Sequence, residues 1–401
     1  MEVLKQELRK IWRPGILLAL ALLGAMYYLL FLEFDVQNFP NGPYAQAQFN
    51  LAREWAQSFG ATMEPAERGQ LDDRFAAEET LFQRELSSLP EAAAAEITDY
   101  RSFTAYVDRV YAAAMQEDGQ VDMHQEKLIQ RIIGGTSYPI LQELDNFRHM
   151  YDLAQQGVPA HLNYDGQDPR HLARTDEIAG SPQRNGYMPV GIYDATYDYS
   201  RNLTVWMVLS VVLLLSPTLV RDRLCRIRAL QWTARPGREI LRTQIAAACL
   251  SALLLSAVNL LLFGGVFLLH NGVLAFQDAG LFSLWALHIP WFDWTYGQYL
   301  LTLAGVMTAL ALGSAGLTVF LSRYSAHYVA MLLKALPLFV VLKLICADLL
   351  INQAFFFGNP LSRLCNVAGA EFWGTGLLLV LSGGLCVLAC RRQHRRELME
   401  P

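Results

Sequence analysis

The chain has 401 residues, of which 53% are apolar and 17% are charged, a mixture too apolar for an ordinary soluble protein. Its net charge of −5 arises within residues 33–202, which hold 27 of the 37 acidic residues, and no basic face interleaved with aromatic residues indicates nucleic-acid binding. The six cysteines all lie outside 33–202, so we expect that segment to fold without disulfides.

Residues 1–13 predict a short amphipathic helix on the cytoplasmic face of a membrane. Its apolar face is formed by positions i, i+4, i+7 and i+8, which are Leu4, Leu8, Ile11 and Trp12. Its polar face carries Lys5, Glu7, Arg9 and Lys10. Pro14 then turns the chain into the bilayer, so we interpret 1–13 as an elbow helix, with a simple membrane anchor as the alternative.

Six segments are apolar for long enough to cross a bilayer, which takes about 20 residues of helix. They cover 16–31, 203–220, 244–269, 298–321, 327–350 and 372–390. The first is not a cleavable signal, because its apolar run is long and no small-residue cleavage site follows it. The chain therefore divides into span one at 14–32, an insert at 33–202, spans two to six within 203–391, and a tail at 392–401.

Basic residues concentrate in 1–13, in the loop 221–243 and in the run RRQHRR after span six. Basic loops mark the cytoplasmic side, so both termini are predicted to lie there. Segment 271–297 is nearly free of basic residues, and its aromatic side chains fit an outer interface belt. Those aromatic residues are Trp285, Trp291, Trp294 and Tyr296. We therefore predict a multi-pass protein of the cytoplasmic membrane, and the disulfide-free insert suggests a bacterial one.

The insert at 33–202 is predicted to be a helical extracytoplasmic domain. Apolar residues recur at helical spacing between 43 and 157, which indicates four or five helices, whereas 158–200 has the composition of a loop. One polar cluster of that loop comprises His161, Asp165, Asp168 and His171. It matches no recognised metal motif, so a plain polar loop is favoured over a metal site. The fold class is an all-α membrane protein with six transmembrane helices and a helical domain inserted between spans one and two.

The loop 221–243 has more structure than membrane anchoring requires. Its arginines alone would satisfy the positive-inside rule, but the loop also embeds apolar side chains and breaks sharply at Pro236-Gly237. The apolar residues are Leu224, Ile227, Leu230 and Trp232. A short helix with such side chains favours docking into a groove of a partner protein.

These features together resemble the permease subunits of ABC-2 type ATP-binding-cassette transporters, which have an elbow helix, a first span, a large extracytoplasmic insert and five further spans. The stretch LQWTARPGREIL is similar to the last part of the family's cytoplasmic loop, with Thr233 at the small hydroxyl position and Pro236 and Arg238 at the turn. Asp222 lies near the family's usual acidic residue. The family's central Gly-Thr pair is absent, and Arg226–Arg228 stands in its place.

The resemblance implies that 221–243 seats on a separate ABC ATPase subunit and that two permease subunits assemble, as a homodimer or a heterodimer. The residues expected to couple to the ATPase are Asp222, Arg226, Leu230, Trp232, Thr233, Arg235, Pro236, Gly237 and Arg238. The chain contains no GxxxxGK[ST], so ATP and Mg²⁺ would bind the partner, and this chain would bind no cofactor and be no enzyme. We expect the membrane-spanning permease of an ATP-driven exporter. The alternative is a membrane-anchored receptor or peptide-binding protein that acts through 33–202.

Two charges lie within span five, where ionisable groups are costly and indicate function by default. Lys343 precedes Asp348 by five residues, near the outer end of the span. We favour a snorkelling lysine or a structural pair over contact with a substrate. The glycines of spans four and six are expected to permit close helix packing. They are Gly305, Gly313, Gly316, Gly383 and Gly384.

Overall fold

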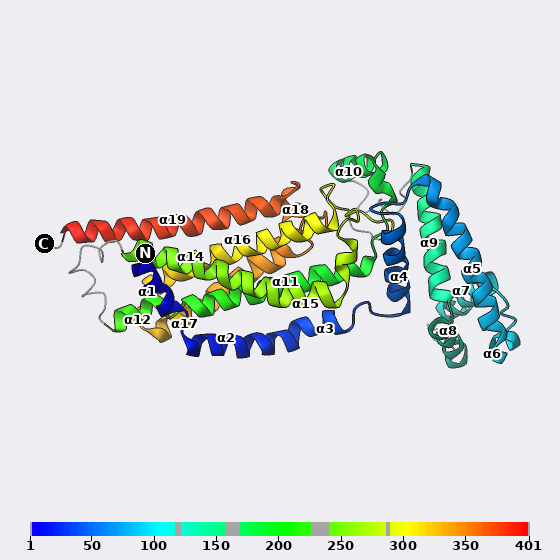
Figure 1. Ribbon diagram of the computed structural model, residues 1–401, viewed down its shortest axis with the longest axis horizontal. Helices are drawn as coiled ribbons and strands as arrows, with labels where there is room; N and C mark the ends of the chain where they lie inside the picture. Colours follow the sequence, from blue (N-terminus) through cyan, green and yellow to red (C-terminus); the bar gives the residue numbers. More distant parts are fainter. Residues whose placement is uncertain (1, 117–121, 158–168, 226–239, 286–288, 400–401) are drawn as a thin grey trace.

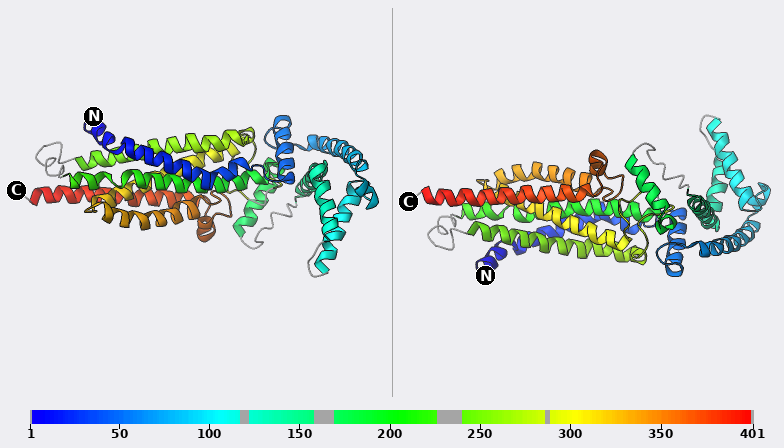
Figure 2. Two further views of the ribbon diagram at one scale, coloured as in Figure 1. Left: turned by 90° about the horizontal axis from the view of Figure 1, so that it is seen from below. Right: turned by 90° about the horizontal axis from the view of Figure 1, so that it is seen from above.

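The computed structural model describes residues 2–116, 122–157, 169–225, 240–285 and 289–399, and the regular structure of these residues is helical. Among these described residues, six helices are long and apolar enough to cross a membrane, as the sequence predicts. They run side by side as a bundle (Figure 1). Both termini lie at one end of this bundle, and the inserted helices lie beyond the other end (Figures 1 and 2).

The spans are built from single helices or from helices continued through a π-helical turn. Their components are α2 (Pro14–Tyr27), η1 (Tyr28–Leu32) and α3 (Glu33–Gln37); α11 (Val190–Leu215) and α12 (Thr218–Leu224); α14 (Ile240–Asn259), η6 (Leu260–Gly264) and α15 (Gly265–His270); α16 (Tyr296–Arg323); α17 (Tyr328–Leu342) and η8 (Lys343–Ile351); and α19 (Ala370–Met399).

Burial differs sharply among the six spans. In the spans containing α11 and α16, 61% and 44% of the most apolar stretch is buried, against 17–28% in the other four. Helices α11 and α16 therefore form the centre of the bundle. The other spans expose long rows of leucine and valine, as helices that face lipid must.

The insert forms a helical end-piece with two hydrophobic clusters. Its helices are α4 (Pro43–Ser58), α5 (Arg68–Ser87), α6 (Pro90–Ala94), α7 (Tyr100–Gln116), α8 (Met123–Gly135) and α9 (Tyr138–Gln155). Helices α4 and α9 join the main core of the bundle, partly through Trp55, which stacks on Trp285 with ring centroids 5.1 Å apart. A second cluster gathers α5, α7 and α8 around Phe82 and Phe103. The insert is thus anchored to the bundle through α4 and α9.

The prediction that 158–200 is loop is wrong over much of its length. Helix α10 (Pro169–Ala179) occupies part of it, and α11 begins already at Val190, so span two extends well into the predicted loop. Proline suits the first position of a helix, where its missing N–H has no partner to lose, and Pro169 begins α10. The buried face of early α11 is largely tyrosine, which the hydropathy pattern does not register as apolar.

The segment between spans five and six forms a buried turn followed by the short helix α18 (Pro360–Cys365). Phe355 and Phe356 in the turn are fully buried. The Glu371 carboxylate at the start of α19 accepts hydrogen bonds from the Phe355 amide and the Ser362 hydroxyl, both at 3.0 Å. This turn therefore belongs to the protein core.

Two of the five glycines in spans four and six lie at close helix contacts. A Cβ at Gly313 would come within 2.9 Å of Leu378, and one at Gly316 within 3.0 Å of Ser382, both on α19. The other three have open space, so close packing explains only part of that pattern.

Gly186 marks a close backbone contact between the insert and the bundle. It precedes α11, its carbonyl accepts a 2.8 Å hydrogen bond from the Leu284 amide, and a Cβ there would overlap the backbone carbonyl of Phe282. Gly186→Ala should therefore destabilise the protein by about 1–3 kcal/mol, measured by thermal unfolding in detergent. The control is Gly69→Ala in α5, where no atom lies within 4 Å. Equal unfolding temperatures for the two variants would refute this contact.

Candidate functional site

The amino-terminal helix contacts both of the helices that flank residues 226–239, which lie outside the described part of the chain. The preceding helix α12 ends at Leu224, and the following helix α14 begins at Ile240. The helix α1 (Glu2–Ile11) packs against α14 at the end of the bundle that carries both termini (Figure 1).

The apolar face of α1 packs against the protein. Ile11 is buried, and the remaining predicted apolar residues contact the main hydrophobic core while partly exposed. These are Leu4, Leu8 and Trp12. The indole N–H of Trp12 donates a 2.9 Å hydrogen bond to the hydroxyl of Ser251 on α14. Helix α1 is therefore docked on the bundle through this face.

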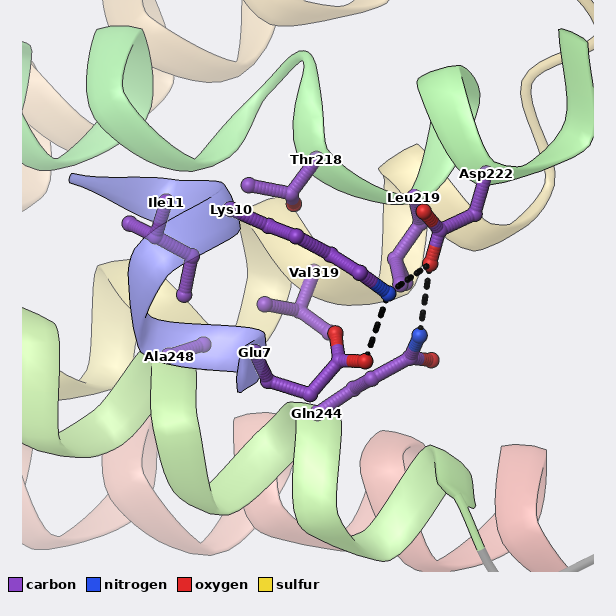
Figure 3. Close-up of a pocket in the computed structure, with 9 residues that line it drawn as sticks. All are labelled: Glu7, Lys10, Ile11, Thr218, Leu219, Asp222, Gln244, Ala248 and Val319. Atoms are coloured by element: carbon purple, nitrogen blue, oxygen red, sulfur yellow. Dashed lines mark hydrogen bonds and ion pairs between the residues drawn. The ribbon is translucent and has the colours of Figure 1, made fainter. Parts of the chain in front are cut away.

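Four polar side chains join α1 to both ends of the loop, and we call Glu7, Lys10, Asp222 and Gln244 the loop-base cluster. The Lys10 ammonium lies 2.6 Å from a Glu7 carboxylate oxygen and 3.4 Å from Asp222 Oδ2 (Figure 3). Gln244 Nε2 donates to the same Asp222 oxygen at 2.8 Å. The cluster thus connects α1, α12 and α14 around one carboxylate.

Burial makes the loop-base cluster a specific contact instead of a loose surface pairing. Glu7, Asp222 and Gln244 are each 6–7% exposed. Burial lowers the pKa of Lys10, but the hydrogen bond that Lys10 donates to Glu7 and the charges of Asp222 and Glu7 outweigh that effect and raise the pKa above its usual value. Lys10 therefore stays charged at neutral pH, with two carboxylates on one cation.

A second tether fixes α12 on the other side. The Arg223 guanidinium donates to the backbone carbonyls of Arg323 and Ser325, at the end of α16, with distances of 2.5 and 2.8 Å. Asp222 and Arg223 are neighbours, so a single turn of α12 is attached to α1 and α14 by one residue and to α16 by the next.

Of the residues predicted to couple to an ATPase, Asp222 alone lies within the part of the chain that the structure describes. The others fall in 226–239, outside the described residues: Arg226, Leu230, Trp232, Thr233, Arg235, Pro236, Gly237 and Arg238. Sequence reasoning missed Gln244 and placed Glu7 on the polar face, although Glu7 is buried. The i, i+3 spacing of Glu7 and Lys10 was an available signal.

The two charges predicted in span five form an ion pair, and a third charge joins them. Lys343 Nζ lies 2.6 Å from Asp348 Oδ2, and Arg201 Nε lies 3.0 Å from Asp348 Oδ1. Lys343 and Asp348 both belong to the π-helix η8, whose i, i+5 repeat brings residues five apart together. Arg201 was missed because it was assigned to the insert.

Metal ligation has no support among the described residues, which contain no group of three or more suitable side chains. His171, the described member of the predicted polar cluster, is buried and lies edge-on to Phe357 at 4.9 Å between ring centroids. His161, Asp165 and Asp168 lie outside the described residues.

Comparison of the chain with protein-family models, with curated proteins and with solved structures gave no match. The functional reading therefore depends on the residues and their geometry.

Proposed function

We propose that this chain is the membrane-spanning permease subunit of an ATP-driven transporter, most consistent with export, and that it works with a separate ABC ATPase. The loop-base cluster is the observation that carries the proposal. A loop that only joined two spans would not need an amino-terminal helix held on both flanking helices, on α12 by the Lys10–Asp222 ion pair and on α14 by the Trp12–Ser251 hydrogen bond and apolar packing. A loop that receives force from a partner would.

The cluster suggests how movement would pass from the ATPase into the membrane. Closure of an ATPase dimer would move the loop 226–239, and the bond between Gln244 and Asp222 would make its two ends move together. Helix α12 continues from α11, the most buried span, so displacement at the loop would reach the centre of the bundle. Such a device converts differential binding at one site into a change between two packed states.

The same proposal assigns the partner subunits and the side of the membrane on which each part of the chain lies. Both termini and the loop would lie in the cytoplasm, the insert would lie outside, and a second permease subunit would complete the pathway. ATP and Mg²⁺ would be bound by the ATPase. A bacterial cytoplasmic membrane fits the basic loops and the cysteine-free insert.

Co-purification tests the proposal directly. The chain, tagged at its carboxyl terminus, would be extracted from native membranes in a mild detergent, and proteins that accompany it in stoichiometric amount would be identified. We expect a nucleotide-binding subunit with the wild type and its loss from the Trp232→Ala/Arg238→Glu variant. Lys127→Ala, in the insert, serves as a control.

If no ATPase accompanies the wild type even after cross-linking, the transporter proposal fails. The helical insert would then be the working part, as in a membrane-anchored receptor or peptide-binding protein.

A further inference from the structure

Three charged side chains meet near the end of the bundle that carries the insert, and we call Arg201, Lys343 and Asp348 the intramembrane charge cluster. Asp348 accepts from Lys343 with one carboxylate oxygen and from Arg201 with the other. Arg201 is on α11, whereas the other two are on η8, so the cluster joins spans two and five.

The charges of this cluster do not balance. Two cations share one carboxylate, which leaves a net charge of about +1 at neutral pH. Among the described residues, no other carboxylate lies within 4.0 Å of Arg201 or Lys343. Asp198, one turn earlier on α11, is exposed and makes no ion pair with Arg201. One positive charge of the cluster therefore has no carboxylate partner among the described residues.

The position of the cluster makes an unbalanced charge expensive. It lies near one end of two spans, where a charged side chain carries a free-energy cost that grows from the membrane interface toward the bilayer centre. The side chains of Arg201 and Lys343 are 39% and 38% exposed. Leu344 and Val341, beside Lys343, are also about half exposed, which places the cluster on a lipid-facing side of the bundle.

We propose that the intramembrane charge cluster binds a phosphate-type oxyanion, such as the head group of an anionic phospholipid. In the described bond to Asp348, Arg201 uses its Nε–H, and a guanidinium has a planar set of further donors that matches phosphate oxygens. An oxyanion here neutralises the excess charge and accepts those hydrogen bonds. This site is independent of the proposed coupling to an ATPase.

The test uses variants that change the net charge of the cluster. Arg201→Gln and Lys343→Gln each leave a neutral pair, so both should lower oxyanion retention about tenfold, the effect of one charge-assisted hydrogen bond. Asp348→Asn leaves two cations without a carboxylate and should raise retention. Lys334→Gln is the matched control, since Lys334 lies on the same span near its other end and donates to the carbonyl of Tyr324.

The measurement is native mass spectrometry of the full chain exchanged into phosphatidylcholine with phosphatidylglycerol added. The proposal expects the wild type and Lys334→Gln to retain phosphatidylglycerol, with the two glutamine variants at the cluster losing it. A second arm adds glycerol 3-phosphate and follows thermal stability. If only this soluble probe stabilises the wild type, and not Arg201→Gln, the oxyanion is a soluble phosphate.

Equal retention by the wild type and both cluster variants would overturn the proposal, as would no response to either probe. An equal loss in Lys334→Gln would also overturn it, because the effect would then be one of general charge. If Arg201→Gln fails to fold, the proposal is still tested by lipid retention in the other two variants, which should fall in Lys343→Gln and rise in Asp348→Asn.

Discussion

An Asp222→Ala chain should lose the firm attachment of α1, and amide exchange within Glu2–Ile11 should become about tenfold faster. The Asp222 carboxylate is buried and accepts from both Lys10 and Gln244. Removing it leaves the Gln244 amide without that acceptor and Lys10 with Glu7 alone. A hydrogen bond to a charged group contributes about 1.5–3 kcal/mol, and about 1.4 kcal/mol is a tenfold change in the opening equilibrium.

Hydrogen–deuterium exchange with mass spectrometry measures this result. Asp222→Asn should be intermediate, because its amide oxygen still accepts from Gln244 while the charge facing Lys10 is gone. Asp72→Ala is the control: Asp72 also pairs with two arginines, Arg68 and Arg148, but its side chain is half exposed. Unchanged exchange of α1 in Asp222→Ala would contradict the structural role of the cluster.

The same variant separates attachment of the ATPase from transmission of movement. Asp222→Ala leaves the residues of 226–239 intact, so under the proposed function the ATPase should still co-purify. Transport should nevertheless fall, because the two loop ends would no longer move as one unit.

Glu143→Gln should remove most of a pH dependence from the stability of the insert, an effect of about 2.5 kcal/mol between pH 5 and 8. Glu143 is 5% exposed and accepts a 2.6 Å hydrogen bond from Gln48 across α4 and α9. Burial raises the pKa of Glu143 to about 7, although the bond from Gln48 opposes this rise.

The direction of this pH dependence follows from whether the folded or the unfolded state binds the proton on Glu143. Between its ordinary pKa of 4.5 and the folded value of about 7, the folded state holds a proton on Glu143 that the unfolded state has lost. The insert is therefore most stable below this window and loses stability as the pH rises through it. The buried Gln48 Oε1, which has no partner among the described residues, can accept from the protonated acid or from the new amide.

Exchange of the α4 and α9 amides at pH 5, 6.5 and 8, corrected for the chemical exchange rate, provides the measurement. The wild type should open more readily at high pH, and Glu143→Gln should change little. Asp145→Asn, at an exposed position of the same helix, should behave as the wild type does. A wild type equally stable across this range would show that Glu143 is not the titrating group.

Hydropathy and periodicity predicted the features that depend on one helix at a time. The six spans follow from apolar runs of sufficient length, and the face formed by Leu4, Leu8 and Ile11 follows from helical spacing. The Lys343–Asp348 pair was also foreseeable, because both residues lie within one span.

The features that sequence reasoning missed depend on how separate helices are set against one another. Gln244 contacts Asp222 only because of the position of α14 along α12, which no local sequence pattern predicts. Arg201 was placed outside span two because the early turns of α11 are rich in polar and tyrosine residues, which lower the hydropathy of that stretch. Glu7 was placed on the polar face of α1, yet it is buried, where it pairs with Lys10 of the same helix while Lys10 also reaches Asp222 on α12.

The central claim is that the loop and both termini face one side of a membrane while the insert faces the other, and two native cysteines test it. Cys225 lies at the start of the loop, and Cys365 ends α18 at the end of the bundle that carries the insert (Figure 1). Both are free and exposed. Chains retaining one of them, with the remaining cysteines replaced by alanine, would be treated with a membrane-impermeant maleimide. The account predicts that Cys365 reacts in intact cells and Cys225 only after lysis. Labelling of Cys225 in intact cells, or protection of Cys365 until lysis, would contradict it.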